Sequence, residues 1–340
     1  MKLTRVILMI AVTAALLGLW LATVDLRAMG QALMRAHPAW IAVAAAGSLL
    51  HLVVRAVRWR AILGPAARAV PLMDLWRYTF IGYAVTFAIP GRAGEVVRPA
   101  LLWRRGGTPF GEALGSILVE RVLDVATLAG MLLAFTLIEP ESSPVAMRRI
   151  AFILAVAAVG GLLALALAAR FMQSAAGAFV ARTTGWLPTR LRAPLRGLLV
   201  ALLDSLGRIA SVRAFLTISA LSLLTWTPVI LTLFAGLRAT DIEAPVAAPL
   251  ALVPLTALGI AIPTPAGVGG YHAAMTWGLT HLMGAEAGPA AAAAVVTHAA
   301  SVLPILVVGL YACWREGLTL SALRRNVPPP PEVTSEPDAS

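Results

Sequence analysis

The stretch IPGRAGEVVR, residues 89–98, interrupts an apolar run that begins at residue 72. Within ten residues it places a proline, two glycines, two arginines and a glutamate where lipid-compatible side chains are expected. Proline and glycine break a helix, and ionisable groups at membrane depth are costly. The stretch therefore raises the question of whether the chain turns back inside a membrane.

The composition is that of an integral membrane protein. Of the 340 residues, 59% are hydrophobic and 13% are charged, about half the usual charged share of roughly a quarter. Eight apolar runs can be recognised, and they predict an all-α polytopic fold. These runs cover residues 6–24, 39–54, 72–90, 110–138, 149–169, 213–237, 246–263 and 288–313. The first run is too long for a convincing signal peptide, so we interpret it as a retained helix.

The basic residues gather in alternate loops, which follows the positive-inside rule. Arg55, Arg58, Arg60 and Arg68 follow the second run, a larger group lies between 170 and 208, and Arg315 follows the last. This pattern predicts a multi-pass protein of the cytoplasmic (inner) membrane with both termini cytoplasmic. The net charge of +11 therefore needs no nucleic-acid partner, since basic loops beside anionic lipid headgroups explain it.

The loop pattern contains a conflict. The segments 55–71 and 91–109 are both rich in arginine, yet only one apolar run separates them. We therefore predict that 72–109 enters the membrane and returns as two half-helices broken at Pro90-Gly91. A second break of the same kind, IPTPAGVGGYH, begins at Ile262. Corresponding breaks in two halves of a chain point to a transporter site and to a possible inverted repeat.

The predicted transmembrane domain covers residues 1–325. Its first half is 1–170 and its second half is 213–325, with a cytoplasmic interfacial segment at 171–212 that mixes basic and apolar residues. The tail 326–340, which contains four consecutive prolines and no hydrophobic periodicity, is predicted to be disordered.

Two groups of charges are candidates for binding. Arg92, Glu95 and Arg98 are spaced three apart, so in a helix they share one face, and two guanidinium groups beside one carboxylate are suited to a lipid phosphate. The alternative is a cytoplasmic turn that only obeys the positive-inside rule.

Glu120, Arg121 and Asp124 form the second group, within a long apolar helix. Glu120 and Asp124 lie four residues apart on one face, where they repel unless a cation lies between them. We expect Arg92 or Arg98 to supply that cation. The alternative is an ion-pair lattice that only fixes the helix packing.

The second break offers a third candidate. Pro263 and Pro265 end one half-helix, and Gly267 and Gly269 allow close backbone approach before the next helix begins near His272. Backbone N–H groups at such a helix start favour an anion. A tight packing turn is an equally good reading, and His272 can be a plain hydrogen-bonding residue.

Several enzyme classes lack their motifs. The chain has no phosphate-binding P-loop, no G-x-S-x-G nucleophile elbow and no H-E-x-x-H metal helix. Its single cysteine, Cys313, rules out an intrachain disulfide, and no Cys/His cluster with metal-ligand spacing occurs. We expect no cofactor.

These motifs, taken together, resemble the flippase-like family that is also called the lysylphosphatidylglycerol synthase transmembrane region. The resemblance rests on RAVRWRAIL from Arg55, the P-x-R-x-G-E-x-x-R run from Pro90, the E-R-x-x-D run from Glu120 and the turn IPTPAGVGG, in the same order and spacing. It implies broken helices and movement of lipids, or of lipid-linked polar groups, between leaflets. No soluble aminoacyl-transfer domain follows here, so lipid aminoacylation is not expected.

One departure from the family pattern lies in the last motif, which typically reads Pro-Gly-Gly-x-Gly-x-x-Glu. Here Ala266 replaces the first glycine, and His272 stands where the glutamate is expected. This change indicates a different headgroup or a proton-sensitive site.

The sequence thus favours a transporter, not an enzyme, whose partner is a membrane lipid with a phosphate or other anionic headgroup. In this hypothesis Arg92 and Arg98 bind the phosphate, and the three carboxylates hold those arginines. An intramembrane enzyme or an accessory scaffold in polyprenyl, glycolipid or hopanoid synthesis remains the alternative, and homo-oligomers or lipid-biosynthesis enzymes remain possible partners.

Overall fold

The computed structural model describes residues 3–89, 93–171, 211–262 and 264–318, together with isolated positions between 182 and 207. Every regular element in these ranges is helical, which confirms the all-α prediction. The helices are α1 (Leu3–Ala22), α2 (Leu26–Arg35), α3 (Pro38–Leu63), η1 (Gly64–Ala67), α4 (Leu72–Ala88), α5 (Gly94–Gly106), α6 (Phe110–Ile138), α7 (Val145–Phe171), α10 (Val212–Ala239), α11 (Ala248–Ala261), η2 (Pro265–Gly267), α12 (Gly270–Met283) and α13 (Ala287–Arg315).

Five of the described helices are long and apolar enough to cross a membrane: α3, α6, α7, α10 and α13. The helices α1 and α2 pass the same test together, although they are bent by 91° at the break between them. Each of the eight predicted runs forms a helix, and α2 is an amphipathic helix that the sequence did not suggest. Most of the predicted interfacial segment 171–212 and the whole tail 326–340 lie outside the described residues.

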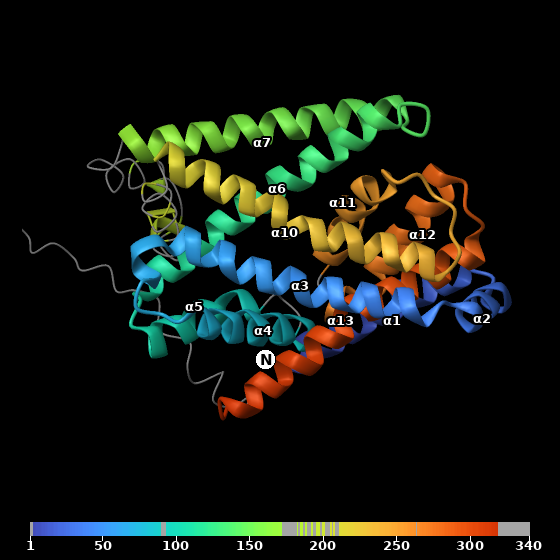
Figure 1. Cartoon of the computed structure of the whole chain (residues 1–340), viewed down its shortest axis with the longest axis horizontal. Helices are drawn as coiled ribbons and strands as arrows, with labels where there is room; N and C mark the ends of the chain where they lie inside the picture. Colours follow the sequence, from blue (N-terminus) through green and yellow to red (C-terminus); the bar gives the residue numbers. More distant parts are fainter. Residues whose placement is uncertain are drawn as a thin grey trace, which may run out of the picture.

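The helix order repeats, as the paired breaks predicted. A long helix, two short helices and a second long helix occur as α3 to α6 and again as α10 to α13. The helices α3 and α10 run side by side in opposite directions (Figure 1). His37 N–H donates to Ala239 O at 2.8 Å near one end, and His51 Nδ1 bonds Thr225 O at 2.8 Å further along. The second set is therefore inverted relative to the first.

Each pair of short helices is a tightly packed antiparallel hairpin. In the α4–α5 hairpin Gly82 faces Gly94, and in the α11–α12 hairpin Gly259 faces Gly270, so that the two backbones touch with no side chain between them. The turn of the second hairpin, η2, contacts α4 of the first hairpin. The two hairpins occupy opposite parts of the long axis, with α4 and α5 on the left and α11 and α12 on the right of Figure 1.

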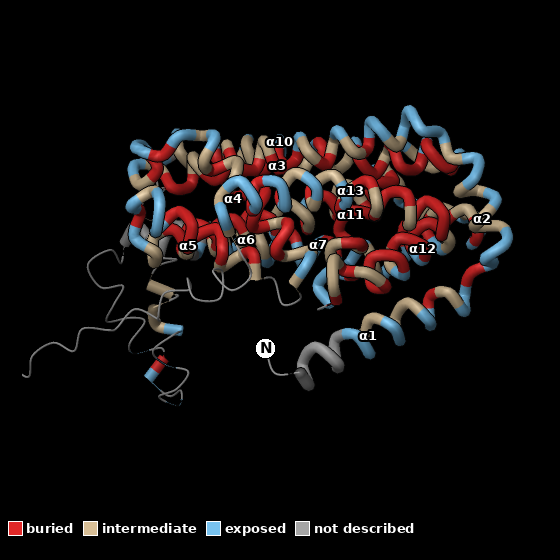
Figure 2. The backbone as a smooth tube through the Cα atoms, turned by 90° about the horizontal axis from the view of Figure 1, so that it is seen from below, coloured by how far each residue is buried: buried red, intermediate tan, exposed pale blue. Residues whose placement is uncertain are grey.

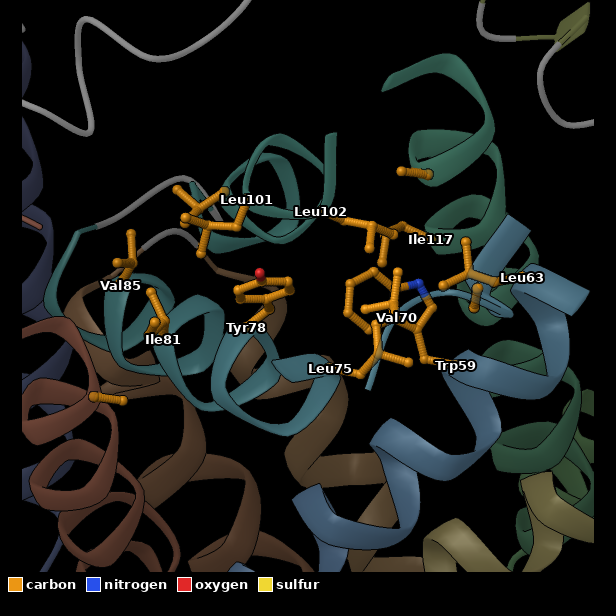
Figure 3. Close-up of a cluster of buried hydrophobic side chains, with 14 of the residues drawn as sticks. Trp59, Leu63, Val70, Leu75, Tyr78, Ile81, Val85, Leu101, Leu102 and Ile117 are labelled. Atoms are coloured by element: carbon orange, nitrogen blue, oxygen red, sulfur yellow. The ribbon is translucent and has the colours of Figure 1, made fainter. Parts of the chain in front are cut away.

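The largest apolar cluster joins the first hairpin to its flanking long helices. Trp59 of α3, Leu75 of α4, Leu102 of α5 and Ile117 of α6 meet in it and are almost completely buried (Figure 3). Buried residues concentrate between the long helices (Figure 2), whereas α7 is exposed along most of its described length. Such an apolar, exposed helix has the character of a lipid-facing surface.

One expectation was wrong at the second run. The arginines after residue 54 were assigned to a cytoplasmic loop, yet α3 continues to Leu63, and Arg55 and Arg58 lie inside it. Both side chains are buried, with exposed fractions of 2% and 0%. The helix continues because Trp59, Ile62 and Leu63 keep its apolar face packed against α6 and α4.

Candidate functional site: a buried charge cluster

Two carboxylates on α6 form the centre of the site. Glu120 is fully buried and Asp124 is 5% exposed, one helical turn apart on the same face, as the sequence predicted. Both would repel strongly in an apolar interior unless cations surround them. The surrounding helices α3 and α5 supply those cations.

Arg98 of α5 holds Glu120 with both of its terminal nitrogens. Its Nη1 donates to Oε2 at 2.8 Å and its Nη2 donates to Oε1 at 3.3 Å. The indole of Trp59 covers the guanidinium at 4.2 Å and donates its own N–H to Ser116 Oγ at 2.9 Å. A bidentate pair of this kind, stacked on an aromatic ring, fixes the arginine in one orientation.

Arg55 and Arg58 of α3 hold Asp124. Arg55 Nη2 donates to Asp124 Oδ2, and Arg58 Nη2 donates to Asp124 Oδ1 at 2.8 Å. Arg55 Nε also lies 3.7 Å from Glu120 Oε2, so this guanidinium lies between the two carboxylates. We expected Arg92 or Arg98 to be the cation that separates them; the structure gives that place to Arg55.

Neutral groups from α10 and α4 complete the shell around α3. Arg58 Nη1 donates to Ser222 Oγ at 3.4 Å, and the Tyr83 ring lies 5.5 Å from the Arg55 guanidinium. His51 Nδ1 must carry its proton, because its partner at 2.8 Å is the Thr225 carbonyl, which can only accept. His51 Nε2 is then free to accept from Arg55 Nη1 at 3.4 Å.

Arg121 and Glu95 lie at the rim of the cluster. Each side chain is 30% exposed, whereas the five central charged side chains are at most 7% exposed. Arg121 Nη1 lies 3.7 Å from Glu95 Oε1, and its Nη2 lies 3.5 Å from Asp124 Oδ2. These separations are longer than those of a good charge-assisted hydrogen bond, so Arg121 is held less firmly than Arg98.

The described cluster has one more positive charge than negative. Four guanidinium groups, of Arg55, Arg58, Arg98 and Arg121, face three carboxylates, of Glu95, Glu120 and Asp124. The Nε atom of each of these four arginines is buried without a hydrogen-bond partner. The described cluster therefore keeps one positive charge in excess and several N–H donors that no protein group satisfies.

The second break forms a separate, uncharged site. Gly267 and Gly269 adopt φ of +76° and +88°, and Ala266 adopts +51°, so the turn follows a left-handed backbone path that favours glycine. We expected this turn to offer free N–H groups to an anion. Three N–H groups that precede α12 have partners within the turn: Gly267 N–H donates to Thr264 O, Val268 N–H to Pro265 O and Gly269 N–H to His272 Nδ1.

His272 packs in an aromatic group away from the carboxylates. Its ring lies 4.8 Å from Trp20 of α1 and 4.8 Å from His298 of α13, and Tyr271 lies 4.6 Å from His298. Trp20 Nε1 donates to Thr276 Oγ1 at 3.0 Å. Two predicted members of the site, Arg92 and Pro263, lie outside the described residues.

Sequence reasoning missed Arg55, Arg58 and His51 as members of the site. A signal was present, because these arginines are three apart and Trp59, Ile62 and Leu63 continue the apolar helical pattern beyond them. The apolar window ended too early, and the arginines were then counted as loop charges.

Comparison with known proteins adds a family and a relative. The glycosyltransferase AglD of Haloferax volcanii is 27% identical over 299 aligned residues, which are 78% of this chain and 47% of that protein. The chain thus corresponds to about half the length of this relative. The family model described as the lysylphosphatidylglycerol synthase TM region matches residues 6–309, nearly the whole transmembrane part. The chain therefore belongs to the lysylphosphatidylglycerol synthase transmembrane region family.

Proposed function

We propose that this protein moves a lipid with a phosphate or other anionic headgroup from one leaflet of the cytoplasmic membrane to the other. The observation that carries the proposal is the charge cluster on α3, α5 and α6, which has one excess positive charge inside an apolar helical bundle. Ionisable groups at that depth usually mark a substrate pathway. A phosphodiester carries one negative charge and would neutralise the excess.

The geometry supports a division of roles within the cluster. Arg98 is occupied by Glu120 and covered by Trp59, so its role is to fix the framework and not, as we expected from the sequence, to bind the phosphate. Arg121 is partly exposed and loosely paired with Glu95, so it can turn toward a headgroup. We assign the first phosphate contact to Arg121, with Glu95 as the carboxylate that pairs with it in this structure.

The hairpins supply the rest of the proposed pathway. The helices α4, α5, α11 and α12 have 17, 13, 14 and 14 residues, so at about 1.5 Å per residue each is shorter than the roughly 30 Å hydrocarbon core. We interpret both hairpins as re-entrant pairs. In that interpretation η2 contacts α4 near the middle of the membrane, where transporters with inverted repeats bind their substrates.

The orientation follows from the two ends of the bundle. Arg60, Arg68, Arg104 and Arg105 lie where α3 ends, α4 begins and α5 ends. Glu139, Glu141, Asp241 and Glu243 lie where α6 and α10 end. By the positive-inside rule the basic end faces the cytoplasm, together with both termini.

A second candidate function, a role in assembling a glycolipid, is favoured by the name of the relative, a glycosyltransferase. The two functions predict different lipids in a strain that lacks the gene. Loss of an accessory or enzymatic role changes the chemical species seen by mass spectrometry. Loss of a transporter leaves the species unchanged and alters their distribution between leaflets.

The direct test is a transport assay in proteoliposomes of phosphatidylcholine with a trace of fluorescent phosphatidylglycerol. Dithionite added outside bleaches the outer leaflet, and further loss of fluorescence reports movement. We expect Arg121→Gln to reduce the rate at least roughly tenfold, the effect of about 1.4 kcal/mol, while the purified variant stays folded. Arg104→Gln, at an exposed position of α5, is the matched control. Equal rates for wild type and Arg121→Gln would overturn the role given to Arg121, and no movement by wild type would overturn the function.

A further inference from the structure

The inverted repeat brings a pair of residues in the second half into the place that Arg121 and Glu95 occupy in the first. Glu95 directly follows Gly94, the first residue of α5, and Tyr271 directly follows Gly270, the first residue of α12. Arg121 lies eleven residues after the start of α6, and His298 lies eleven residues after the start of α13. The two residues of each half share the same register in their helices.

The contacts agree with the register. In the first half Arg121 pairs with Glu95 at 3.7 Å, and in the second half the rings of His298 and Tyr271 lie 4.6 Å apart, nearly perpendicular at 82°. The glycines that precede Glu95 and Tyr271 make the same close backbone contact with their partner helices. His298 therefore stands where the first half has a guanidinium, with an ionisable group in place of a permanent charge.

His298 is a buried polar group with nothing to bond. It is 7% exposed, and both of its ring nitrogens are buried without a hydrogen-bond partner. A neutral imidazole has one donor and one acceptor, and leaving both empty costs free energy that a bound group would recover. His272 stacks on it at 4.8 Å and 21°, and the ring of Trp20 lies 4.8 Å from that of His272.

The helices around His298 bring no permanent charge to it among the described residues. The titratable groups that face it, Tyr271 and His272, both come from α12. The helix α1 contributes Trp20, whose ring contacts His272, and α2 contributes Met29, which packs against the apolar cluster of Trp20, Val24 and Ala291. Gly236 of α10 lies against Thr297, the residue before His298, and Ala44 of α3 packs with Ala300. The helix α4 contacts α13 further along, at Gly309.

We propose that His298, with His272 stacked on it, is a second station for the lipid's anionic group, which it binds only when the pair carries a proton. This inference rests on the proposed function. Imidazole exchanges its proton near neutral pH, and two adjacent imidazolium rings repel, so the pair holds one proton. A protonated His298 has two N–H donors and no acceptor, and a phosphate oxygen supplies the acceptor. Proton and headgroup therefore enter this station together.

The two halves would therefore bind the same anion with a different dependence on pH. The arginines of the first half keep their charge at every physiological pH. The histidines of the second half attract the headgroup only where protons are available. A difference in pH across the membrane would thus favour one direction of movement.

The test is the pH dependence of transport in the same vesicles, buffered equally on both sides between pH 8 and 5.5. We expect the wild-type rate to rise by roughly an order of magnitude as the pH falls, because the loaded station then forms more often. His298→Gln keeps the polar volume but cannot carry a proton, so its profile should be flat. His281→Gln, an exposed position on α12, is the control that should keep the wild-type profile. A pH-dependent His298→Gln variant, or a flat profile for wild type that does transport lipid, would overturn the proposal.

A binding measurement separates this proposal from the proposed function. Protonated imidazole quenches a nearby indole, and Trp20 lies 4.8 Å from His272. The difference in fluorescence between the wild type and a Trp20→Phe variant is the contribution of Trp20. Its dependence on pH therefore reports the protonation of the His272–His298 pair. Short-chain phosphatidylglycerol, added in detergent, should move the midpoint of this signal to higher pH by linkage, in wild type and not in His298→Gln. If the lipid does not shift the midpoint of this fluorescence change, the second station is refuted even where transport is observed. If the midpoint shifts but no transport is observed, the second station is supported and the proposed function is refuted.

Discussion

The individual side chains of the charge cluster stabilise one another through shared ion pairs, and no single pair holds the cluster together. Burying an ion costs several kcal/mol, which the attraction to its partner offsets only when the geometry is good and the remaining donors are paired. The two oxygens of Glu120 are paired, because Arg98 donates to both of them and the Nε of Arg55 lies nearby, whereas the Nε atoms of the arginines have no hydrogen-bond partner. Removing one charge therefore leaves others buried and uncompensated.

The substitution Glu120→Gln should destabilise the fold by about 3–5 kcal/mol, because Arg98 and Arg55 would lose their shared counter-charge in the interior. Chemical unfolding of the purified protein in detergent, followed by tryptophan fluorescence, measures the change. Glu141→Gln, at an exposed position after α6, should change the free energy of unfolding by less than about 0.5 kcal/mol. Equal stabilities of the two variants would show that the cluster does not hold the bundle together.

At the scale of elements, both hairpins depend on glycine at the point where their backbones cross. A Cβ on Gly94 would overlap the carbonyl oxygen of Gly82, and a Cβ on Gly270 would overlap that of Gly259. Backbone atoms cannot move aside as side chains can, so each hairpin would have to open. The opening in the first hairpin would also shift Arg98, one helical turn beyond Gly94, away from Glu120.

We therefore expect Gly94→Ala to cost about 3 kcal/mol or more and to abolish lipid movement. Gly111→Ala is the matched control, because a Cβ at this position of α6 meets no atom within 4 Å. It should stabilise the helix by roughly 0.5–1 kcal/mol through the better helix propensity of alanine. Thermal unfolding in detergent compares the two, and a Gly94→Ala variant as stable as wild type would contradict the close contact.

At the scale of the whole molecule, ion pairs tie the last helix to the first hairpin at the basic end. Glu316, just after α13, pairs with Arg105 of α5 and with Arg77 of α4 at 3.4 Å. Arg105 also donates to the Glu316 carbonyl at 3.0 Å. The two inverted halves are thus joined across their boundary at this end, in addition to the long contact between α3 and α10.

The inverted arrangement makes a prediction about the two sides of the membrane. The base of the first hairpin starts near Arg68 and ends near Arg104, so cysteines placed at these two exposed positions should react with an impermeant maleimide from the same side. Cysteines at Glu141 and Glu243 should react from the opposite side. Each variant also carries Cys313→Ser, so that the introduced cysteine is the one thiol that can react. Labelling of Arg68→Cys and Arg104→Cys from opposite sides would mean that the first hairpin crosses the membrane.

The class of protein and most of the architecture could be predicted from local patterns in the amino-acid sequence. Helical apolar runs, charge density and paired Ile-Pro breaks are local signals, and they correctly predicted an all-helical membrane fold and the positions of eight helices. The two Ile-Pro breaks fall where α4 and α11 end. The carboxylates on α6 were also found this way, because an ionisable residue inside an apolar run is visible without knowledge of its neighbours.

Which charged side chains pair with one another could not be predicted from the sequence and follows from the packing of the helices. Arg55 and Arg58 lie more than sixty positions before Asp124 in the chain, and their pairing follows from the packing of α3 against α6. His298 lies within an alanine-rich run that suggests nothing but a helix, and its link to Tyr271 and His272 needs the hairpin to fold back onto α13. Side chains from distant elements share a site because of helix packing, and no local pattern encodes that distance.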